Sequence, residues 1–518
     1  MATSYLTPGV YVEEIPSANK PIEGVGTAVA AFVGLAPGGP INTPMRISNW
    51  TQFAKIFGDP MNPDNGPFME GAYLAHAVYG FFQNGGNLAW IIRVGNESGR
   101  GAAAQAALPA ANDKAVEALR AVALKPGGDQ ITIEITEDPP AGEAAKDPAE
   151  STYTVIVTAG SEREEYPSVT LKKGRGSIAT KVNAASKLIK IEDTGAATPE
   201  TKLAAGTYTL SAPPLTKEAV EPGHFEGDVA TRKGMGGLAP LDEVTMLAMP
   251  DIMTLNGDGK QMRDLQGKMI AQCEISGGRM CILDAPAGLL PQEVLEWRMN
   301  TAGYDSKFAT LYYPWLEVMD PITRRPLMVP PSGHMAGLWS RVDGSRGVHK
   351  APANEVILGV NGIEFNIAGP EQGELNRVGI NCIRAFPGGG IRPWGARTLS
   401  SDPEWRYINV RRIFNYVSSS IMQGTQWAVF EPNDQRLWTS LTISISNFLN
   451  RVWRSGALFG AGAGEAYFVK CDAETNPPDV IEAGQVVCEI GISPVKPAEF
   501  VIFRLSQFTG GGGAEVAE

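Results

Sequence analysis

Histidines are the first side chains to weigh in this sequence, because imidazoles serve as metal ligands and as general acids and bases. The chain holds four of them, and none has a partner at the spacing of a zinc site. His76 falls in a helical pattern, which favours a packing role. His349 falls in a Gly- and Arg-rich loop, which favours a hydrogen bond to the backbone, and the other two are His224 and His334. These positions predict no metal site.

Two glycine-rich stretches have the composition of phosphate loops but lack their context. Gly257-Asp-Gly-Lys260 lacks the earlier glycine and the Ser or Thr of a P-loop. The run Gly460–Gly464 follows a predicted helix rather than a strand, which favours a helix stop. Asp251 and Asp284 follow predicted strands, but no polar partner lies nearby in sequence, so turn or capping roles are favoured. We therefore predict no catalytic residue and no cofactor.

Length and composition describe an ordinary globular chain. With 518 residues, two to four domains are expected. The net charge of −12 argues against a general nucleic-acid binder. The five cysteines are odd in number and lack CxxC spacing, which predicts buried reduced thiols and suits a cytoplasmic chain. We expect no signal peptide and no segment inserted in a membrane.

The C-terminal stretch from Trp405 to Ser506 carries the densest pattern. One amphipathic helix is predicted from near Glu404 to the break at Glu431-Pro432-Asn433, with Arg406, Arg411 and Arg412 off its apolar line. A second helix follows, capped by Asn433 or Asp434 and ended by Gly460. Predicted strands follow at 467–471, 486–490 and 499–505. The last is apolar on both faces, so both faces need cover.

The rest of the chain predicts an α/β body with an insertion. Strands and helices alternate in 27–94 and again from 244, which favours a parallel or mixed sheet covered by helices. Between them, 96–236 is rich in short alternating strands and is predicted to be a small inserted β domain on the outside. Residues 320–400 are expected to be loop-rich. A separate short strand is predicted at Thr7–Ile15, which must pair with its own body or another subunit.

Several stretches outside the insertion together resemble the contractile tail sheath proteins of phages, R-type bacteriocins and contractile injection systems. The stretches are YLTPGVYVEE, IFGDP, AYLAHAVYGFFQNGGNLAWIIRV, LYYPWLEVMDP, PPSGHMAGLWSRVDGSRGVHKAPANE, NRVGINCIRAFPGGGIRPWGARTLS, WRYINVRRIFNYVSSSIMQGTQWAVFEPND and PAEFVIFRLSQ. The resemblance implies a structural protein, not an enzyme. It implies hexameric rings stacked helically around an inner tube, which contract without consuming nucleotide and drive the tube through a target envelope.

The same resemblance implies partners and a place of assembly. The partners are other copies of the chain, an inner tube protein, and baseplate and terminator or cap proteins, with no nucleic acid. Assembly is expected in the bacterial cytoplasm, as part of a phage tail or tail-like particle. Two other interpretations stay open: a non-contractile tail or shell protein, and a degenerate α/β hydrolase.

The resemblance also assigns residues. The N- and C-terminal arms of the family add strands to sheets in neighbouring subunits, and the C-terminal domain faces the tube. The arm residues are Val10, Tyr11, Val12, Glu13, Phe500, Val501, Ile502, Phe503 and Leu505. The candidate contacts to acidic groups of the tube are Arg436, Arg451 and Arg454, for which a solvated helix face is the alternative.

The middle domain of many sheath proteins is similar to the subtilisin fold. Ser332–Ala336 resembles the turn that carries the nucleophile in that fold, but His334 occupies the position where a serine is needed. A non-catalytic scaffold is therefore expected. The expected domains are an N-terminal arm and linker (1–24), an α/β middle domain (25–95 plus 237–400), the insertion (96–236), an α+β C-terminal domain facing the tube (401–495) and a C-terminal arm with a Gly-rich tail (496–518).

Overall fold

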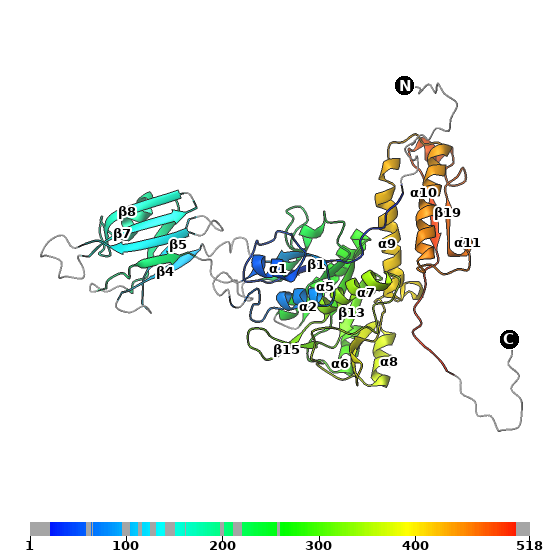
Figure 1. Ribbon diagram of the computed structural model, residues 1–518, viewed down its shortest axis with the longest axis horizontal. Coiled ribbons are helices and arrows are strands. Elements are labelled where there is room, and N and C mark those ends of the chain that lie inside the picture. Colours follow the sequence, from blue (N-terminus) through cyan, green and yellow to red (C-terminus); the bar gives the residue numbers. More distant parts are fainter. Residues whose placement is uncertain are drawn as a thin grey trace, which may run out of the picture.

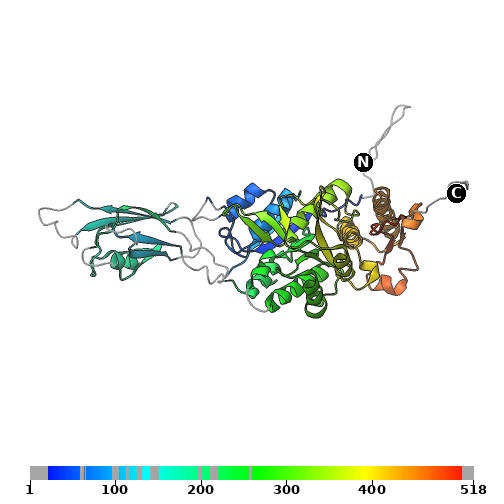
Figure 2. The same ribbon diagram turned by 90° about the horizontal axis from the view of Figure 1, so that it is seen from below.

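The computed structural model describes residues 21–58, 64, 66–95, 104–111, 116–124, 131–139, 151–160, 162–196, 201–210, 220–255 and 259–503. Within these residues the chain forms three parts along one axis (Figure 1). A β-rich part lies at one end, a helix-covered sheet in the middle and a pair of long helices at the other end, and Figure 2 shows the same order from below.

The middle part is built on a mixed sheet of eight strands among the described residues, in the order β18-β17-β13-β12-β11-β1-β3-β2. The six inner strands are parallel, and the strand at each edge is antiparallel to its neighbour. The strands are β1 Val29–Gly34, β2 Met45–Ile47, β3 Leu88–Arg93, β11 Met246–Ala248, β12 Met280–Asp284, β13 Ala309–Tyr313, β17 Ile380–Phe386 and β18 Gly390–Pro393. The predicted mixed sheet is confirmed.

Helices cover both faces of this sheet, as a parallel sheet requires. On one face lie α1 Trp50–Phe57, α2 Leu74–Gln83 and α7 Ser332–Arg346; on the other lie α5 Lys260–Ser276, α6 Pro291–Glu296 and α8 Gly369–Arg377. Two separate apolar cores result, one for each face. Smaller elements border them: β14 Leu316–Met319, β15 Pro326–Val329, β16 Gly362–Ile363, α4 Pro222–Glu226, η4 Gly234–Leu238, η5 Pro250–Thr254 and the π-helical η6 Trp297–Ala302.

Helix α7 contradicts the expectation that 320–400 is loop-rich. This range also contains α8, β17 and β18, but α7 is the central miss, because Ser332–Ser340 is buried on every side and leaves no polar face to read. The helix packs closely on α2 through glycines. A Cβ at Gly333 would lie 2.4 Å from Ala77 Cα, and one at Gly337 would lie 2.4 Å from the Phe81 carbonyl oxygen.

The inserted part has its own core. A four-stranded sheet, β10-β6-β7-β8, and a three-stranded sheet, β4-β5-β9, enclose it together with α3. The bounds are β4 Gln105–Pro109, β5 Glu117–Ala123, β6 Ile131–Glu137, β7 Thr152–Ala159, β8 Glu162–Thr170, α3 Ile178–Ala185, β9 Ile189–Asp193 and β10 Gly206–Thr209. All buried members of this core lie between Ala106 and Leu210.

The C-terminal layer consists of two long helices and a small sheet. Its elements are η7 Pro403–Trp405, α9 Ile408–Gly424, η8 Gln426–Ala428, α10 Gln435–Arg454, α11 Ala463–Ala466, β19 Tyr467–Lys470, α12 Pro478–Glu482 and β20 Glu489–Ile492. The predicted cap is confirmed, because Asp434 accepts hydrogen bonds from the backbone N–H groups of Arg436 and Leu437. The predicted end of the first helix is wrong: α9 ends at Gly424, where a side chain would collide with Ile22.

Candidate assembly surface at the C-terminal layer

The linker, residues 21–27, is the first feature that ties this layer to the rest of the chain. The Ile22 side chain is fully buried in the core between α9 and α10. Its carbonyl oxygen accepts a hydrogen bond of 2.5 Å from Arg451, and the Val25 N–H donates to Ser420 Oγ at 3.1 Å. Gly24 lies so close to the Tyr416 ring that a Cβ would clash with its hydroxyl. The linker is therefore seated on the helices before it enters β1.

Arg412 joins three parts of the molecule at one point. Its guanidinium forms a two-pronged ion pair with Asp343 of α7, at 2.8 and 2.5 Å, and stacks 4.7 Å from the Trp339 ring centre. It also donates to the Thr27 carbonyl at 3.0 Å, and the Thr27 hydroxyl donates to Asp343 at 2.6 Å. The two charged side chains are 4% exposed. Helix α9, helix α7 and the linker are thus fixed to one another.

The expectation that Arg411 and Arg412 lie off the packed face of their helix is wrong. Arg411 is 8% exposed, and its guanidinium lies 4.4 Å from the Trp405 ring centre and 4.8 Å from that of Phe308. Burial lowers its pKa to about 10. Both arginines are buried because α9 lies between α10 and the middle part, so it has two packed faces rather than one. Cation–π contacts and the ion pair compensate for the buried charge.

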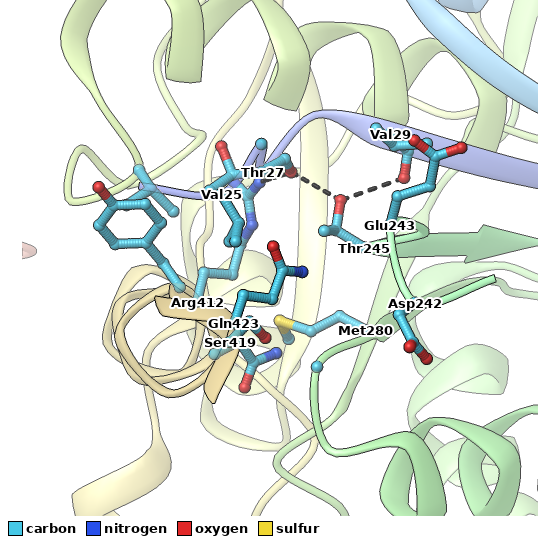
Figure 3. A pocket seen from close by; sticks show the side chains of 15 residues that line it. Val25, Thr27, Val29, Asp242, Glu243, Thr245, Met280, Arg412, Ser419 and Gln423 are labelled. Atoms are coloured by element: carbon cyan, nitrogen blue, oxygen red, sulfur yellow. Dashed lines mark hydrogen bonds between the residues drawn. The ribbon is translucent and has the colours of Figure 1, made fainter. Parts of the chain in front are cut away.

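A cavity of about 170 Å³ lies at this joint (Figure 3). Arg412, Ser419 and Gln423 of α9 line one side, and Asp242 and Thr245 ahead of β11 line the other. The Thr245 hydroxyl spans to the linker, donating to the carbonyls of Thr27 and Val29 at 2.7 and 3.1 Å. No histidine or cysteine is among the lining residues. The cavity is a packing gap between α9 and the middle part.

The root of the C-terminal arm is held by a single carboxylate. Glu499 accepts hydrogen bonds from Arg397 Nε at 2.8 Å and Nη2 at 2.6 Å, from Asn376 Nδ2 at 2.7 Å and from the Tyr407 hydroxyl at 3.1 Å. Burial alone would raise the pKa of Glu499, but the hydrogen bonds from Arg397 and Asn376 hold the pKa below its ordinary value. The arm is thus pinned to the middle part before it leaves the surface. No pattern in the sequence pointed to this cluster.

Beyond Glu499 the predicted arm residues are exposed. Phe500, Val501, Ile502 and Phe503 are 74%, 69%, 80% and 83% exposed and form no strand within this single chain. Leu505 lies outside the described residues, as do Val10, Tyr11, Val12 and Glu13. Four consecutive exposed apolar side chains are unusual for a soluble surface.

The small sheet of β19 and β20 has one packed and one open face. Tyr467, Val469, Ile490 and Ile492 face the core with α10. On the other face Phe468 is 57% exposed, and its cross-strand partner is Gly491. A Cβ at Gly491 would lie 2.1 Å from the Phe468 ring. Each of the two strands pairs on one side only among the described residues. The outer edge of β19 is therefore unpaired among the described residues, and that of β20 is unpaired until residues 493–495, which pair with 457–459.

The three arginines predicted to contact a tube lie on α10, which contains no acidic residue. Arg436 and Arg454 are exposed and share one face with Ile443, which is 41% exposed. Arg451 lies at the edge of this face and already donates to the Ile22 carbonyl. The structure thus leaves Arg436 and Arg454 exposed on one side of α10, near its two ends, and Arg451 is exposed as well but also bonds to the linker.

The side chains weighed for catalysis serve as packing and capping groups. Asp251 accepts from the backbone N–H of Leu35 at 2.6 Å and from that of Tyr73, and Asp284 accepts from the Ser332 N–H at the start of α7 at 2.8 Å. Burial raises the pKa of Asp251 to about 6 and that of Asp284 to about 7. The predicted capping roles are confirmed.

The histidines fit the same picture. His76 packs against the Phe68 ring at 4.8 Å, as predicted, and burial lowers its pKa to about 4. His334 is 2% exposed in the first turn of α7, and burial lowers its pKa to about 4 as well. Among the described residues, no group of three or more His, Cys, Asp or Glu side chains is arranged to hold a metal ion. None of the described helices is long and apolar enough to span a bilayer.

Comparison with known protein families decides what this arrangement belongs to. Residues 242–399 match the model of the phage tail sheath protein central domain, and 400–508 match that of the phage tail sheath C-terminal domain. Together the matches span more than half of the chain. The chain belongs to the contractile tail sheath family.

Tail sheath proteins are similar to this chain, one of them over nearly its whole length. The tail sheath protein of Burkholderia phage BcepMu is 25% identical over 97% of both chains. The putative prophage major tail sheath protein of Pseudomonas aeruginosa strain UCBPP-PA14 is 28% identical over 39% of this chain and 52% of its own. This member of the family is a structural sheath subunit and a component of a phage tail or tail-like particle.

Solved structures agree with the fold. The helical sheath of the anti-feeding prophage in its contracted state is 25% identical, with a TM-score of 0.58, over 97% of this chain and 100% of that one. The sheath complex of the extracellular contractile injection system PVC, also contracted, is 23% identical with a TM-score of 0.58 over 98% of each chain. The mixed α/β architecture is therefore that of sheath proteins.

Proposed function

We propose that this sheath subunit polymerises as stacked hexameric rings around an inner tube and that the assembly contracts to drive the tube through a target envelope. The observation that carries the proposal lies near the chain ends: polar contacts anchor Ile22 and Glu499 to the folded body, and Phe500–Phe503 beyond Glu499 are exposed. Ile22 with Arg451 holds one end, and Glu499 with Arg397 holds the other. Ends of this kind suit a lattice whose subunits stay connected while they rotate.

The arms are the proposed connections between subunits. Val10–Glu13 of one copy and Phe500–Leu505 of another would add to the free edges of β19 and β20 in a neighbour. Main-chain hydrogen bonds then supply the strength, and side-chain pockets supply the register. Two features support the proposal: the four exposed apolar residues after Glu499 and the open face around Phe468.

The basic face of α10 is the proposed contact to the inner tube. Arg436 and Arg454 would pair with acidic groups of the tube, with Arg451 as a lesser contributor because its guanidinium also holds Ile22. Exposed ion pairs contribute about 0–1 kcal/mol each, so a contact repeated over many subunits can hold the extended state and still release.

The middle part is the proposed scaffold, of subtilisin-like type and without catalytic activity. His334 is buried at the start of α7, and Asp284 contacts Ser332, which is itself 0% exposed, so neither is placed beside a nucleophile that a substrate could reach. We propose the domain division 1–24, 25–95 with 237–400, 96–236, 401–495 and 496–518. Baseplate and terminator proteins are the further proposed partners, and the bacterial cytoplasm is the proposed place of assembly.

Electron microscopy of the chain co-expressed with its tube protein tests the proposal. Striated cylinders of two lengths and widths are expected, the shorter one appearing after mild denaturant or heat. Cylinders of one fixed length would favour a non-contractile tail component instead. Soluble monomers that hydrolyse ester or peptide substrates would favour the degenerate hydrolase.

Two sets of variants test the proposed contacts. Deletion of residues 1–17 should leave a folded monomer that no longer forms connected rings, and cylinders that still contract would refute strand exchange. Arg436→Glu with Arg454→Glu should weaken assembly on the tube while leaving monomer stability unchanged. The control is Arg377→Glu on α8, whose side chain is 72% exposed and far along the chain from α10.

A further inference from the structure

Two cysteines lie opposite each other at the end of the small C-terminal sheet. In the antiparallel pairing of β19 with β20, Lys470 is the partner of Glu489. The next step of the same register places Cys471 opposite Cys488. The two thiols are within hydrogen-bonding reach of each other, and both belong to the inward face that packs against α10.

The geometry of this pair suits a disulfide. Directly opposed residues of antiparallel strands have Cα atoms about 4.5 or 5.5 Å apart, depending on the hydrogen-bonding pattern. Disulfides need Cα separations of about 4.4–6.8 Å and side chains on the same face. Both conditions follow from the register, so no strand has to move. The Asn476 side chain already holds the facing chain, accepting from the Val487 N–H at 2.6 Å and donating to the Val487 carbonyl at 3.0 Å.

We propose that Cys471 and Cys488 form an oxidation site, a reduced thiol pair that closes to a cross-strand disulfide when the particle meets small-molecule disulfides outside the reducing cell. The Cys488 thiolate, which is partly exposed, attacks one sulfur of the small disulfide and expels one thiolate as leaving group. The Cys471 thiolate then attacks Cys488 sulfur in the mixed disulfide and expels the second thiolate. The protein loses two electrons and two protons, and the small disulfide is reduced to two thiols.

The environment explains why the pair stays reduced until then. Burial, together with the neighbouring Cys471, raises the pKa of Cys488 to about 12, and burial also raises the pKa of Cys471. Few thiolates therefore exist at neutral pH, and the exchange is slow. A reducing cytoplasm would keep such a pair open during assembly, whereas an oxidising exterior would close it over time.

The consequence falls on the sheet that accepts the arms. A disulfide would close the loop between Cys471 and Cys488, which carries α12, and would fix the ends of β19 and β20 against each other. This second part rests on the proposed strand exchange. The oxidation itself depends only on the geometry of the single chain, so the two can fail independently.

The buried pair Cys273 and Cys281 provides an internal control. These thiols also approach each other, but both are 0% exposed, between α5 and β12, so a small disulfide cannot reach them in the folded chain. Selective oxidation of the C-terminal pair therefore distinguishes a site from general thiol chemistry.

The test incubates the full chain with oxidised glutathione at pH 8.5, quenches with an alkylating agent and maps the peptides by mass spectrometry. The expected product is a peptide pair linked through Cys471 and Cys488, with Cys273 and Cys281 alkylated only after unfolding. Hydrogen exchange of the β20 amides should slow by about tenfold or more in the oxidised chain, as expected of a loop closure. Cys488→Ser should abolish both effects, and Cys273→Ser should leave both unchanged.

Three outcomes would overturn the proposal. One is a stable glutathione adduct at Cys488 that Cys471 does not displace. Another is linkage of the two residues only in denaturant. The third is a disulfide between two copies of the chain, seen as a dimer on a non-reducing gel. If the disulfide forms but assembly does not depend on the arms, the oxidation site stands and the proposed strand exchange falls.

Discussion

Arg412 and Arg377 both pair with a carboxylate, yet their surroundings differ. The Arg412 side chain is 4% exposed and held by Asp343, Thr27 and the Trp339 ring, whereas Arg377 is 72% exposed and pairs with Glu374 three residues earlier on α8. Water screens the second pair and is excluded from the first. The loss of one partner therefore has different consequences, because only the buried pair leaves an uncompensated charge behind.

Replacement of Arg412 should test this difference. Arg412→Ala leaves the buried Asp343 carboxylate without its ion-pair partner and should lower the free energy of unfolding by about 3–5 kcal/mol. Arg377→Ala should cost about 0–1 kcal/mol. Urea unfolding followed by tryptophan fluorescence would measure both. Equal effects would mean that the joint is open to water.

The buried carboxyl of Asp284 predicts how the stability of the fold depends on pH. Burial raises its pKa to about 7, above the ordinary value of 3.8, so the fold favours the protonated form. The stability that this proton contributes is fully present below about pH 4 and is lost as the pH rises through about 7, at about 1.4 kcal/mol for each pH unit at most. Asp284→Asn can still accept from the Ser332 N–H but does not ionise.

The melting temperature of Asp284→Asn, relative to the parent chain, should therefore rise between pH 5 and pH 8. Asp305→Asn is the matched control. Hydrogen bonds from Ser401 lower the pKa of Asp305, so this carboxylate is ionised in the folded and the unfolded chain across the same range. Its effect on the melting temperature should not change with pH. A flat profile for Asp284→Asn as well would place a charged carboxylate at this site.

At the scale of elements, close helix packing decides which glycines matter. Gly333 and Gly344 both lie in α7, but only Gly333 faces the backbone of α2. A Cβ at Gly333 would lie 2.4 Å from Ala77 Cα, whereas nothing lies within 4 Å of one at Gly344. Gly333→Ala should cost about 1–3 kcal/mol or more through overpacking. Gly344→Ala should stabilise by about 0.5–1 kcal/mol through helix propensity. Thermal unfolding of the two variants should shift in opposite directions.

Much of the middle sheet could be predicted from the sequence. The central strands β1, β3, β11, β12 and β13 are continuous apolar runs between turns, and the Asp434 cap follows from local hydrogen bonding, whereas β17 and β18 lie in a range that was expected to be loop-rich. Helix α7 could not be read in this way, because burial on every side removes the contrast on which periodicity depends. The same limit applies to α9, where two packed faces bury Arg411 and Arg412.

The contacts that anchor Glu499 and Ile22 could not be predicted from the sequence for a different reason. Glu499 is held by Arg397, Asn376 and Tyr407, which lie about 90–120 residues away along the chain, and Ile22 is held by Arg451. Contacts at such separations depend on the completed fold. For Phe500–Phe503 the apolar run in the sequence indicated a segment that needs cover on both faces, and the family resemblance assigned it as an arm.

At the scale of the whole molecule, the inserted part stands apart from the other two (Figure 1). Its core draws only on residues between Ala106 and Leu210. The residues that flank it on either side, Val94 and Val220, belong to one common core in the middle part. The two points of attachment are therefore close together, which is the arrangement that tolerates insertion and removal of a domain.

Replacement of residues 97–219 by a short Gly/Ser linker should leave the remaining chain folded, because no core residue of the other parts is lost and the linker has little distance to span. Calorimetry should show the disappearance of one transition, with the others displaced by no more than about 2 °C. A fragment of residues 104–210 should give the missing transition by itself. If the arms and α10 carry assembly, the shortened chain should still form cylinders on the tube, with a smaller outer diameter. Loss of folding in the shortened chain would show that the insertion stabilises the middle part, and loss of cylinders alone would show that it contributes contacts between subunits.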